Sequence, residues 1–219
     1  MVITYYGVSC LKVQSGETVL AFDPPSKEFP AKDYELKIPR FQADIVLISH
    51  SQHKDHNGHS TLAGKPSILD GPGEYEIKGI QIAGIKSFHD EVSGERNGLN
   101  TIYTLVFEDI SICHMGDFGE KELESETEEA IGKVDILFVP ISITDKSNKI
   151  VMDPQNAAKI VTQLEPKVVI PMHYHKDKKL LKKFLDEFGN GAVKPIEKLV
   201  IKKKDLEGKK AEVVVLSNV

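Results

Sequence analysis

The 219-residue sequence contains no tryptophan and only two cysteines. Cys10 and Cys113 lie far apart in the chain, so neither a disulfide framework nor a paired thiolate metal motif is indicated. No apolar stretch approaches the ~20 residues that cross a bilayer. Residues 2–6 are typical of a strand rather than of a secretion signal. We therefore expect a reduced, soluble, cytoplasmic protein with no membrane partner.

Positive charge is also in short supply, because 28 lysines and arginines stand against 33 acidic residues, for a net charge of −5. This balance argues against a surface that attracts nucleic acid as a whole, although a local basic groove is not excluded. A chain of this length, 40% hydrophobic, buries a real core in one domain. We expect a single domain over residues 1–219 and leave open whether it forms a homo-oligomer.

The densest chemistry in the sequence follows the apolar run 45–49. His50, His53, Asp55 and His56 fall within seven residues. Imidazole nitrogen and carboxylate oxygen are the ligands that ions such as Zn²⁺ prefer, and a loop anchored by a strand can turn several of them toward one cavity. The stretch therefore predicts a metal site.

A ligand-type residue also stands at the end of three other predicted strands. These residues are His89, Asp117 and His173. Taken alone, His89 and Asp90 are better explained as a polar strand end that faces water. Four such strand ends together are hard to explain by packing, and strand ends along one edge of a sheet stack converge on a common face. The sequence thus predicts one site assembled from four segments.

Alternation and turn signals predict an α/β (α+β) chain without internal repeats. Strands are expected at residues 2–6, 10–13, 17–22, 45–49, 74–78, 80–86, 101–107, 110–115, 134–139, 167–172, 199–203 and 212–216. Helices are expected at residues 121–133, from Asp153 to about 164, and at 180–188. Residues 24–42 read as an irregular loop, and residues 91–100 as a flexible rim.

The same residues resemble the metallo-β-lactamase superfamily. The resemblance lies in His53-Lys-Asp-His56 after an apolar strand, in His89, in Gly116-Asp117 and in His173. More narrowly, residues 71–76, 98–103, 114–119, 134–140 and 166–174 resemble a branch related to ascorbate-6-phosphate lactonase. The match runs from about residue 2 to 175. It implies a four-layer αββα sandwich, in which two facing sheets have helices on both outer faces and a two-metal site at one edge.

The resemblance also implies two metal positions bridged by Asp117. The first position would be held by His50, His53 and His89, and the second by Asp55, His56 and His173. Asp23 would brace the histidine loop and fix imidazole orientation. With nitrogen and oxygen ligands only, we expect two divalent ions, with Zn²⁺ favoured and Mn²⁺ or Fe²⁺ also compatible.

The histidine cluster departs from the family order His-x-His-x-Asp-His by one extra residue between His50 and His53. Either His50 stays a ligand and the extra residue bulges out, or Ser51 occupies the usual position and the first metal is held weakly. We favour the bulge, because His50 directly follows the strand. Relatives often carry histidine where this chain has Glu120, and glycines at residues 141–143. Because of these two departures, the resemblance does not identify the substrate.

The function implied by the resemblance is a metal-dependent hydrolase that uses a metal-bound hydroxide on a small ester, lactone or phosphoester. Two divalent ions that share a water lower its pKa from ~16 to near neutrality and polarise the scissile bond. Asp55 or Asp117 would orient the hydroxide. His175 is either an acid or supporting group, or an exposed loop histidine. His114 either points away from Asp117 or supports it.

Three other functions are weighed against this one. A phosphodiesterase or nuclease would use the lysines at 178, 179, 182 and 183 as a phosphate-binding face. A non-catalytic metal-binding or sensing module would hold one ion or none. A di-iron oxidoreductase would need an electron-carrier domain that these 219 residues do not provide.

Overall fold

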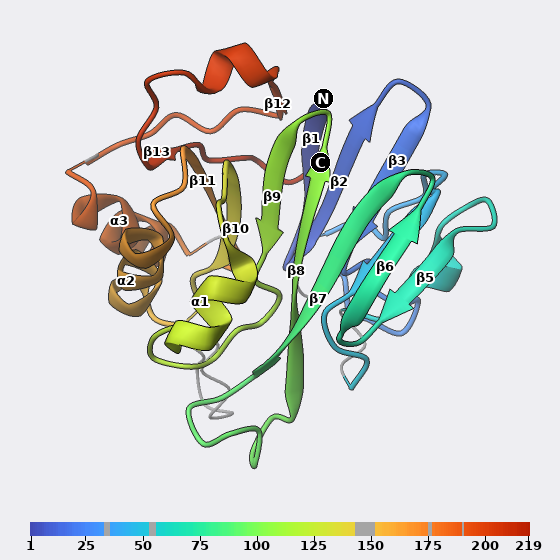
Figure 1. Cartoon of the computed structure of the whole chain (residues 1–219), viewed down its shortest axis with the longest axis horizontal. Coiled ribbons are helices and arrows are strands. Elements are labelled where there is room, and N and C mark those ends of the chain that lie inside the picture. The colour runs from blue at the N-terminus through green and yellow to red at the C-terminus, as the bar shows by residue number, and fades with distance from the viewer. Residues whose placement is uncertain (33–35, 53–55, 143–151, 175–176, 190) are drawn as a thin grey trace.

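The computed structural model describes residues 1–32, 36–52, 56–142, 152–174, 177–189 and 191–219. Within these residues, two mixed β-sheets face each other (Figure 1). The six-stranded sheet has the order β12 (Lys198–Val200), β1 (Val2–Gly7), β2 (Cys10–Ser15), β3 (Thr18–Phe22), β4 (Ile45–Ile48) and β5 (Ser67–Asp70). The seven-stranded sheet has the order β13 (Glu212–Val213), β11 (Val168–Met172), β10 (Ile136–Pro140), β9 (Ile110–His114), β8 (Leu99–Phe107), β7 (Ile80–Phe88) and β6 (Gly73–Ile77).

The strand directions bring several carboxyl ends to one edge of the sandwich. β1 and β3 are both antiparallel to β2, and β3 is parallel to β4. The strands β1, β3 and β4 therefore end on the same side. In the other sheet, β7, β9, β10 and β11 share one direction. The two edges meet, because Ser49 after β4 accepts a hydrogen bond from Thr101 in β8, and Val8 after β1 accepts one from His173 after β11. The loops after these strands therefore gather at one place.

The main core lies between the two sheets. It is formed by inward-facing residues of both, for example Leu20 and Phe22 of β3 against Tyr103 of β8 and Phe138 of β10. Within this core the Tyr103 hydroxyl donates to the carbonyl of Ile48 at 3.0 Å, which ties β8 to β4 across the sandwich. Removal of so much apolar surface from water is the main stabilising term for the sandwich.

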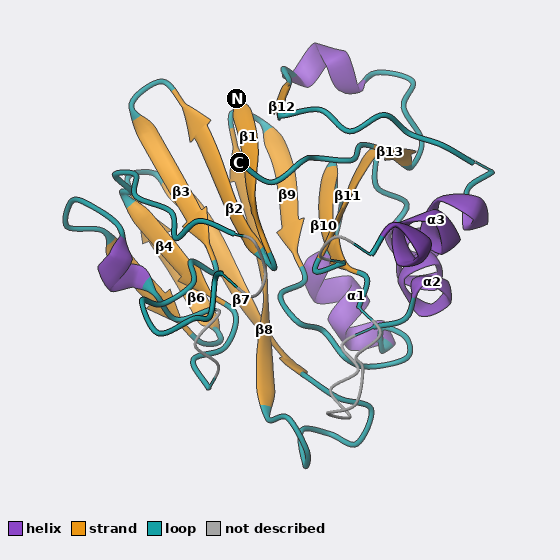
Figure 2. Ribbon diagram, turned by 180° about the vertical axis from the view of Figure 1, so that it is seen from behind, coloured by secondary structure: helices purple, strands orange, loops and turns teal. Residues whose placement is uncertain are grey.

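Helices cover the outer face of the seven-stranded sheet (Figure 2). They are α1 (Ser125–Ile131), α2 (Pro154–Leu164) and α3 (Lys178–Glu187). α2 starts as predicted, with the Asp153 side chain accepting from the backbone N–H groups of Gln155 and Asn156. None of the helices in the described ranges is long and apolar enough to cross a membrane.

The outer face of the six-stranded sheet is covered more thinly. In the described part of the chain, the short 3₁₀ turn η1 (His59–Thr61) and its flanking loops pack there, with Phe41, Ala43 and Leu62 against Val46. The expected two-sheet sandwich is therefore confirmed, and the described residues on this outer face form loops and the 3₁₀ turn η1.

Two predicted hairpins are confirmed. β6 and β7 pair around Lys78-Gly79, and β8 and β9 pair around Glu108-Asp109. All four turn residues have positive φ, between 55° and 75°, which is the backbone twist of tight two-residue hairpin loops.

Some predicted boundaries are wrong. The helix at 121–133 covers only Ser125–Ile131, because both backbone groups of Leu123 bond the Gln163 side chain and keep that segment extended. The strand at 199–203 ends at Val200, because Asp205 accepts from the Lys202 N–H and starts the 3₁₀ turn η2 (Lys203–Leu206). The edge strand β5 was not predicted.

Candidate metal centre

The centre of the site is the carboxylate of Asp117, which is 3% exposed. Four imidazoles from both sheets surround it. Its Oδ1 lies 3.1 Å from His56 Nε2, and its Oδ2 lies 3.2 Å from His89 Nε2, 3.3 Å from His173 Nε2 and 3.9 Å from His50 Nε2. The structure thus brings together residues that stand more than 100 positions apart in the sequence.

His50 is oriented by a series of hydrogen bonds that starts at Asp23 and passes through Ser49. Asp23, fully buried after β3, accepts from the Ser49 N–H at 2.7 Å and from the Ser49 hydroxyl at 2.8 Å. Because the Ser49 hydroxyl donates to Asp23, it accepts from His50 Nδ1, 3.0 Å away. This assigns the proton of His50 to Nδ1 and leaves Nε2 as the atom that faces Asp117.

Asp117 is placed by a tight turn after β9. Gly116 has φ of 59°, and a Cβ there would lie 2.4 Å from both Ser49 Cβ and Asn100 Oδ1, so only glycine fits. Asn100 bonds both ends of the turn, accepting from the Asp117 N–H at 2.9 Å and donating to the Met115 carbonyl at 2.9 Å. The Ser9 hydroxyl donates to Asp117 Oδ1 at 3.0 Å.

The backbone around His89 is clamped by two segments. The Phe88 N–H donates to Glu120 at 3.0 Å, and the Phe88 carbonyl accepts from Gly119 at 2.9 Å. On the other side, the His89 carbonyl accepts from the Asn97 side chain at 3.2 Å. The Glu120 side chain therefore contributes here by accepting a hydrogen bond from the backbone.

The loop after His89 is ordered by a single carboxylate. Asp90 accepts from four backbone N–H groups, at Val92, Gly94, Arg96 and Asn97, over 2.7–3.0 Å. These hydrogen bonds lower the pKa of Asp90, although burial acts to raise it. His89 and Asp90 are only 3% and 4% exposed, so the explanation that they form a water-facing strand end is wrong.

His173 differs from the other histidines in its strain and exposure. Its φ is 63°, a left-handed conformation that is costly for histidine, and its N–H donates to the Val8 carbonyl at 2.8 Å and is 3.2 Å from the Tyr5 hydroxyl. Its side chain is 18% exposed, whereas that of His50 is 1% and that of His56 is 0% exposed. The site therefore opens toward solvent beside His173.

Burial and neighbouring charges shift the pKa values of this site strongly. Burial acts to raise the pKa of Asp117, but the neighbouring His173 and His56 hold it well below its ordinary value. Burial raises the pKa of Asp23 to about 7, with His56 and the Ser49 hydrogen bonds acting against it. Burial also lowers the pKa of His114 to about 4, so this imidazole is neutral at pH 7.

The structure brings five of the predicted site residues close together. They are His50, His56, His89, Asp117 and His173. Three others, His53, Asp55 and His175, lie outside the described residues. The sequence reasoning missed Ser9 and Asn100, because a serine and an asparagine next to strands carry no distinctive signal before their neighbours in space are known.

The donor set fits a divalent ion of the zinc type. His50, His56 and Asp117 each offer a ligand atom, and these three atoms lie within 4.8 Å of one another. All are imidazole nitrogens or carboxylate oxygens, which such ions prefer. The surrounding Ser49, Ser9 and Asn100 hold the ligands by hydrogen bonds, as is usual around protein metal sites.

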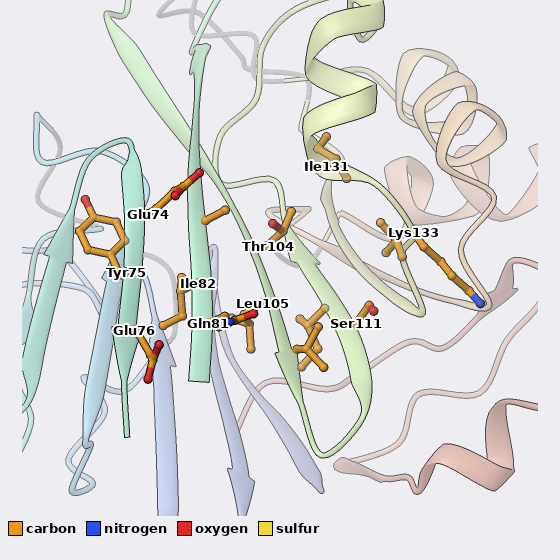
Figure 3. Close-up of a pocket in the computed structure, with 14 residues that line it drawn as sticks. Glu74, Tyr75, Glu76, Gln81, Ile82, Thr104, Leu105, Ser111, Ile131 and Lys133 are labelled. Carbon is orange, nitrogen blue, oxygen red and sulfur yellow. The ribbon is translucent and has the colours of Figure 1, made fainter. Parts of the chain in front are cut away.

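A separate groove of about 540 Å³ lies on the outer face of β6 to β9 (Figure 3). Glu74, Glu76 and Gln81 lie on one side of it and Lys133 on the other. Of the described residues that line it, none is a histidine, so this groove is not part of the metal centre.

The fold and the histidine-carboxylate constellation together define a metal-dependent hydrolase of the metallo-β-lactamase type. The chain belongs to the β-lactamase superfamily, since the family described as "Beta-lactamase superfamily domain" matches residues 2–173.

Individual relatives agree with this assignment. A UPF0173 metal-dependent hydrolase from Thermococcus onnurineus is 26% identical over 198 residues, covering 79% of this chain and 84% of that protein. One from Lysinibacillus sphaericus is 26% identical, covering 80% and 86%. A crystal structure of a protein from Thermotoga maritima, described as a member of the metallo-β-lactamase superfamily, is 27% identical with a TM-score of 0.72, covering 98% of this chain and 97% of that one.

Proposed function

We propose that this hydrolase cleaves a small ester, lactone or phosphoester with the help of two divalent ions bound around Asp117. The observation that carries the proposal is the division of the Asp117 carboxylate. Oδ1 faces His56, whereas Oδ2 faces His89 and His173, with His50 Nε2 3.9 Å away. A carboxylate with imidazoles on both oxygens has the geometry of a bridging ligand.

The proposed ligands divide between two positions that share Asp117. The first comprises His50, His53 and His89, and the second comprises Asp55, His56 and His173. Zn²⁺ is the favoured ion, and Mn²⁺ and Fe²⁺ suit the same donors. When bound, such ions supply an acidified water at neutral pH and neutralise charge that develops on the substrate.

The chain's own groups have three tasks in this proposal. Asp55 or Asp117 would orient the attacking water. His175 donates a proton to the leaving group. The substrate enters beside His173, the most exposed imidazole of the described site, while the other ligands are shielded from water.

His50 rather than Ser51 is proposed as the ligand at the start of the cluster. His50 is 4% exposed, and its Nε2 belongs to the group of ligand atoms around Asp117. Ser51 is exposed, and its carbonyl accepts from the Asn57 side chain. The exposure of Ser51 supports the interpretation in which the extra residue bulges out and His50 stays a ligand.

A small, polar substrate suits the surroundings. A pocket of about 150 Å³ lies beside the His89 loop and is lined by Arg96, Asn97, Glu120, Lys121 and Asn156, among others.

Both cysteines are buried free thiols, in keeping with the proposed cytoplasmic location.

The test is turnover by the purified protein, loaded with Zn²⁺ or Mn²⁺, on three probes: an aliphatic lactone, p-nitrophenyl acetate and bis-p-nitrophenyl phosphate. Metal-dependent cleavage of the lactone or acetate supports the proposal. Cleavage of the phosphodiester alone would restrict the substrate to phosphoesters, and cleavage of nucleic acid by the same preparation would favour the phosphodiesterase or nuclease alternative. No turnover with either ion would favour a binding or sensing module.

The choice between His50 and Ser51 has its own test. We expect His50→Ala to bind fewer metal ions per chain, and Ser51→Ala to bind as many as the unchanged protein. Full metal occupancy in His50→Ala would contradict the assignment.

A further inference from the structure

His114, the last residue of β9, is fully buried between the two sheets. Its ring stacks on Phe22, with centroids 4.9 Å apart, and meets Phe138 edge-on at 5.9 Å. A histidine that only fills a core has no need of polar partners from several segments, but this one has three.

The partners of His114 assign the positions of its proton. The Gly116 N–H donates to Nδ1 at 3.0 Å, so Nδ1 carries the lone pair. Nε2 lies 3.2 Å from the Ser9 carbonyl, which accepts, so Nε2 carries the hydrogen. The Asp23 carboxylate lies nearby, with Oδ2 3.7 Å from Nε2, beyond hydrogen-bond distance. Burial lowers the pKa of His114, so its ring is neutral at pH 7. A neutral imidazole accepts a hydrogen bond at one nitrogen and donates one from the other.

Each partner of His114 leads to a residue that holds the metal site. Asp23 bonds Ser49, which bonds His50. The segment of Ser9 carries the hydroxyl that donates to Asp117 Oδ1.

The third partner acts on the turn itself. Gly116 is the residue directly before Asp117, and its left-handed backbone aims that carboxylate into the site. One imidazole on the seven-stranded sheet is therefore hydrogen-bonded to the Ser9 segment of the six-stranded sheet and to its own turn, and it lies next to the Asp23 carboxylate.

We propose that His114 is a positioning residue that sets the ligands of the two sheets, His50 on one side and Asp117 on the other, at metal-binding distance. This inference rests on the proposed function only in requiring that the site bind metal. Loss of a hydrogen-bonding group around the ligands of a metal typically weakens metal binding about 10–100-fold.

The test uses three substitutions. His114→Phe keeps the aromatic contacts with Phe22 and Phe138 but removes both hydrogen bonds. His114→Asn retains an acceptor near the Nδ1 position, and His114→Gln retains a donor near the Nε2 position. We expect the Zn²⁺ affinity, measured by competition with a chromophoric chelator, to fall at least about tenfold in His114→Phe and less in the other two.

The matched control is Cys113→Ala. Cys113 is equally buried in the same strand, but its side chain belongs to the cluster under the helices and contacts Met115. We expect this variant to lose stability without losing Zn²⁺ affinity. Unfolding of the metal-free proteins, followed by circular dichroism, separates the stability effect from the metal effect.

Unchanged Zn²⁺ affinity in His114→Phe would overturn the inference. If His114→Phe does not fold, the Asn and Gln variants decide, and unchanged affinity in both would overturn it equally. Failure of the proposed metal site is recognised separately, because the unsubstituted protein would then bind no Zn²⁺.

Discussion

The molecule contains two buried aspartates at opposite ends of neighbouring strands, and their surroundings differ completely. Asp117 follows β9, and Asp135 precedes β10, which runs parallel to β9. Asp135, 0% exposed, lies 2.8 Å from Lys167 Nζ and 2.6 Å from Lys203 Nζ and accepts from the Ser111 N–H at 3.0 Å. Among the described residues, the ion-pair partners of Asp117 are all histidines.

The difference lies in the charges that surround the two carboxylates. Lysine is charged at every physiological pH, so Asp135 carries its own permanent counter-charges. Histidine has an ordinary pKa of about 6.5, so its charge, unlike that of lysine, is not permanent near pH 7. Imidazoles that bind a metal ion do so in their neutral form, and the divalent ions proposed here would then supply the positive charge beside Asp117.

The largest effect is expected for Asp117→Asn, which keeps the shape of the side chain and removes its charge. We expect turnover of the metal-loaded protein to fall roughly a thousandfold, because the shared ligand of both proposed ions is lost. The comparison variant is Asp135→Asn, which should retain turnover within a few fold. Steady-state kinetics on the best of the three probes checks this, and similar losses in both variants would erase the distinction.

Metal removal should destabilise only those variants in which Asp117 is intact. An ion present at a thousand times its dissociation constant stabilises the folded state by about 4 kcal/mol. Thermal unfolding of the unchanged protein and of Asp135→Asn should therefore shift downward with a chelator and recover with Zn²⁺. A chelator shift of the same size in Asp117→Asn would count against this account.

Asp135→Asn should itself lower the free energy of unfolding. Breaking a buried ion pair costs about 3–5 kcal/mol, and we expect the lower end, about 3 kcal/mol, since the Lys167 and Lys203 side chains are 28% and 47% exposed. Urea unfolding of the metal-free protein measures it. A loss below about 1 kcal/mol would show that these lysines stabilise little.

The contribution of Asp135 should also depend on pH in a defined direction. Burial acts to raise its pKa, but hydrogen bonds from Lys167 and Lys203 lower it to about 2, against about 3.9 in the unfolded chain. The resulting stabilisation, about 2 kcal/mol, is fully present above pH 4 and is lost as the pH falls through 2. The stability difference between the unchanged protein and Asp135→Asn should shrink over that range, and a constant difference would contradict the pKa assignment.

The sequence predicted the Asp117 region far better than the Asp135 region. Histidines at strand ends are chemically distinctive, so His50, His56, His89 and His173 could be assigned to one site before their distances were known. Asp135 falls inside the predicted strand 134–139 and carries no distinctive signal of its own. Its partner Lys203 stands 68 positions away, and only the folded chain brings them together.

The parts that escaped prediction are those set by spatial neighbours. The loop after His89 is rich in glycine and asparagine, which suggested a flexible rim, yet Asp90 holds four of its N–H groups. The strand β5 was missed because its side chains are mostly exposed on a sheet edge, with little apolar alternation. Turn residues, by contrast, were correctly interpreted at both hairpins, because their backbone demands are local.

The most direct test of the central claim is elemental analysis of three proteins purified without chelator: the unchanged chain, Asp117→Asn and Asp135→Asn. We predict two divalent ions per chain in the first and third, and fewer than one in Asp117→Asn. Equal metal content in the two variants would contradict the claim that Asp117, and not simply a buried aspartate at the end of a strand, organises a metal centre.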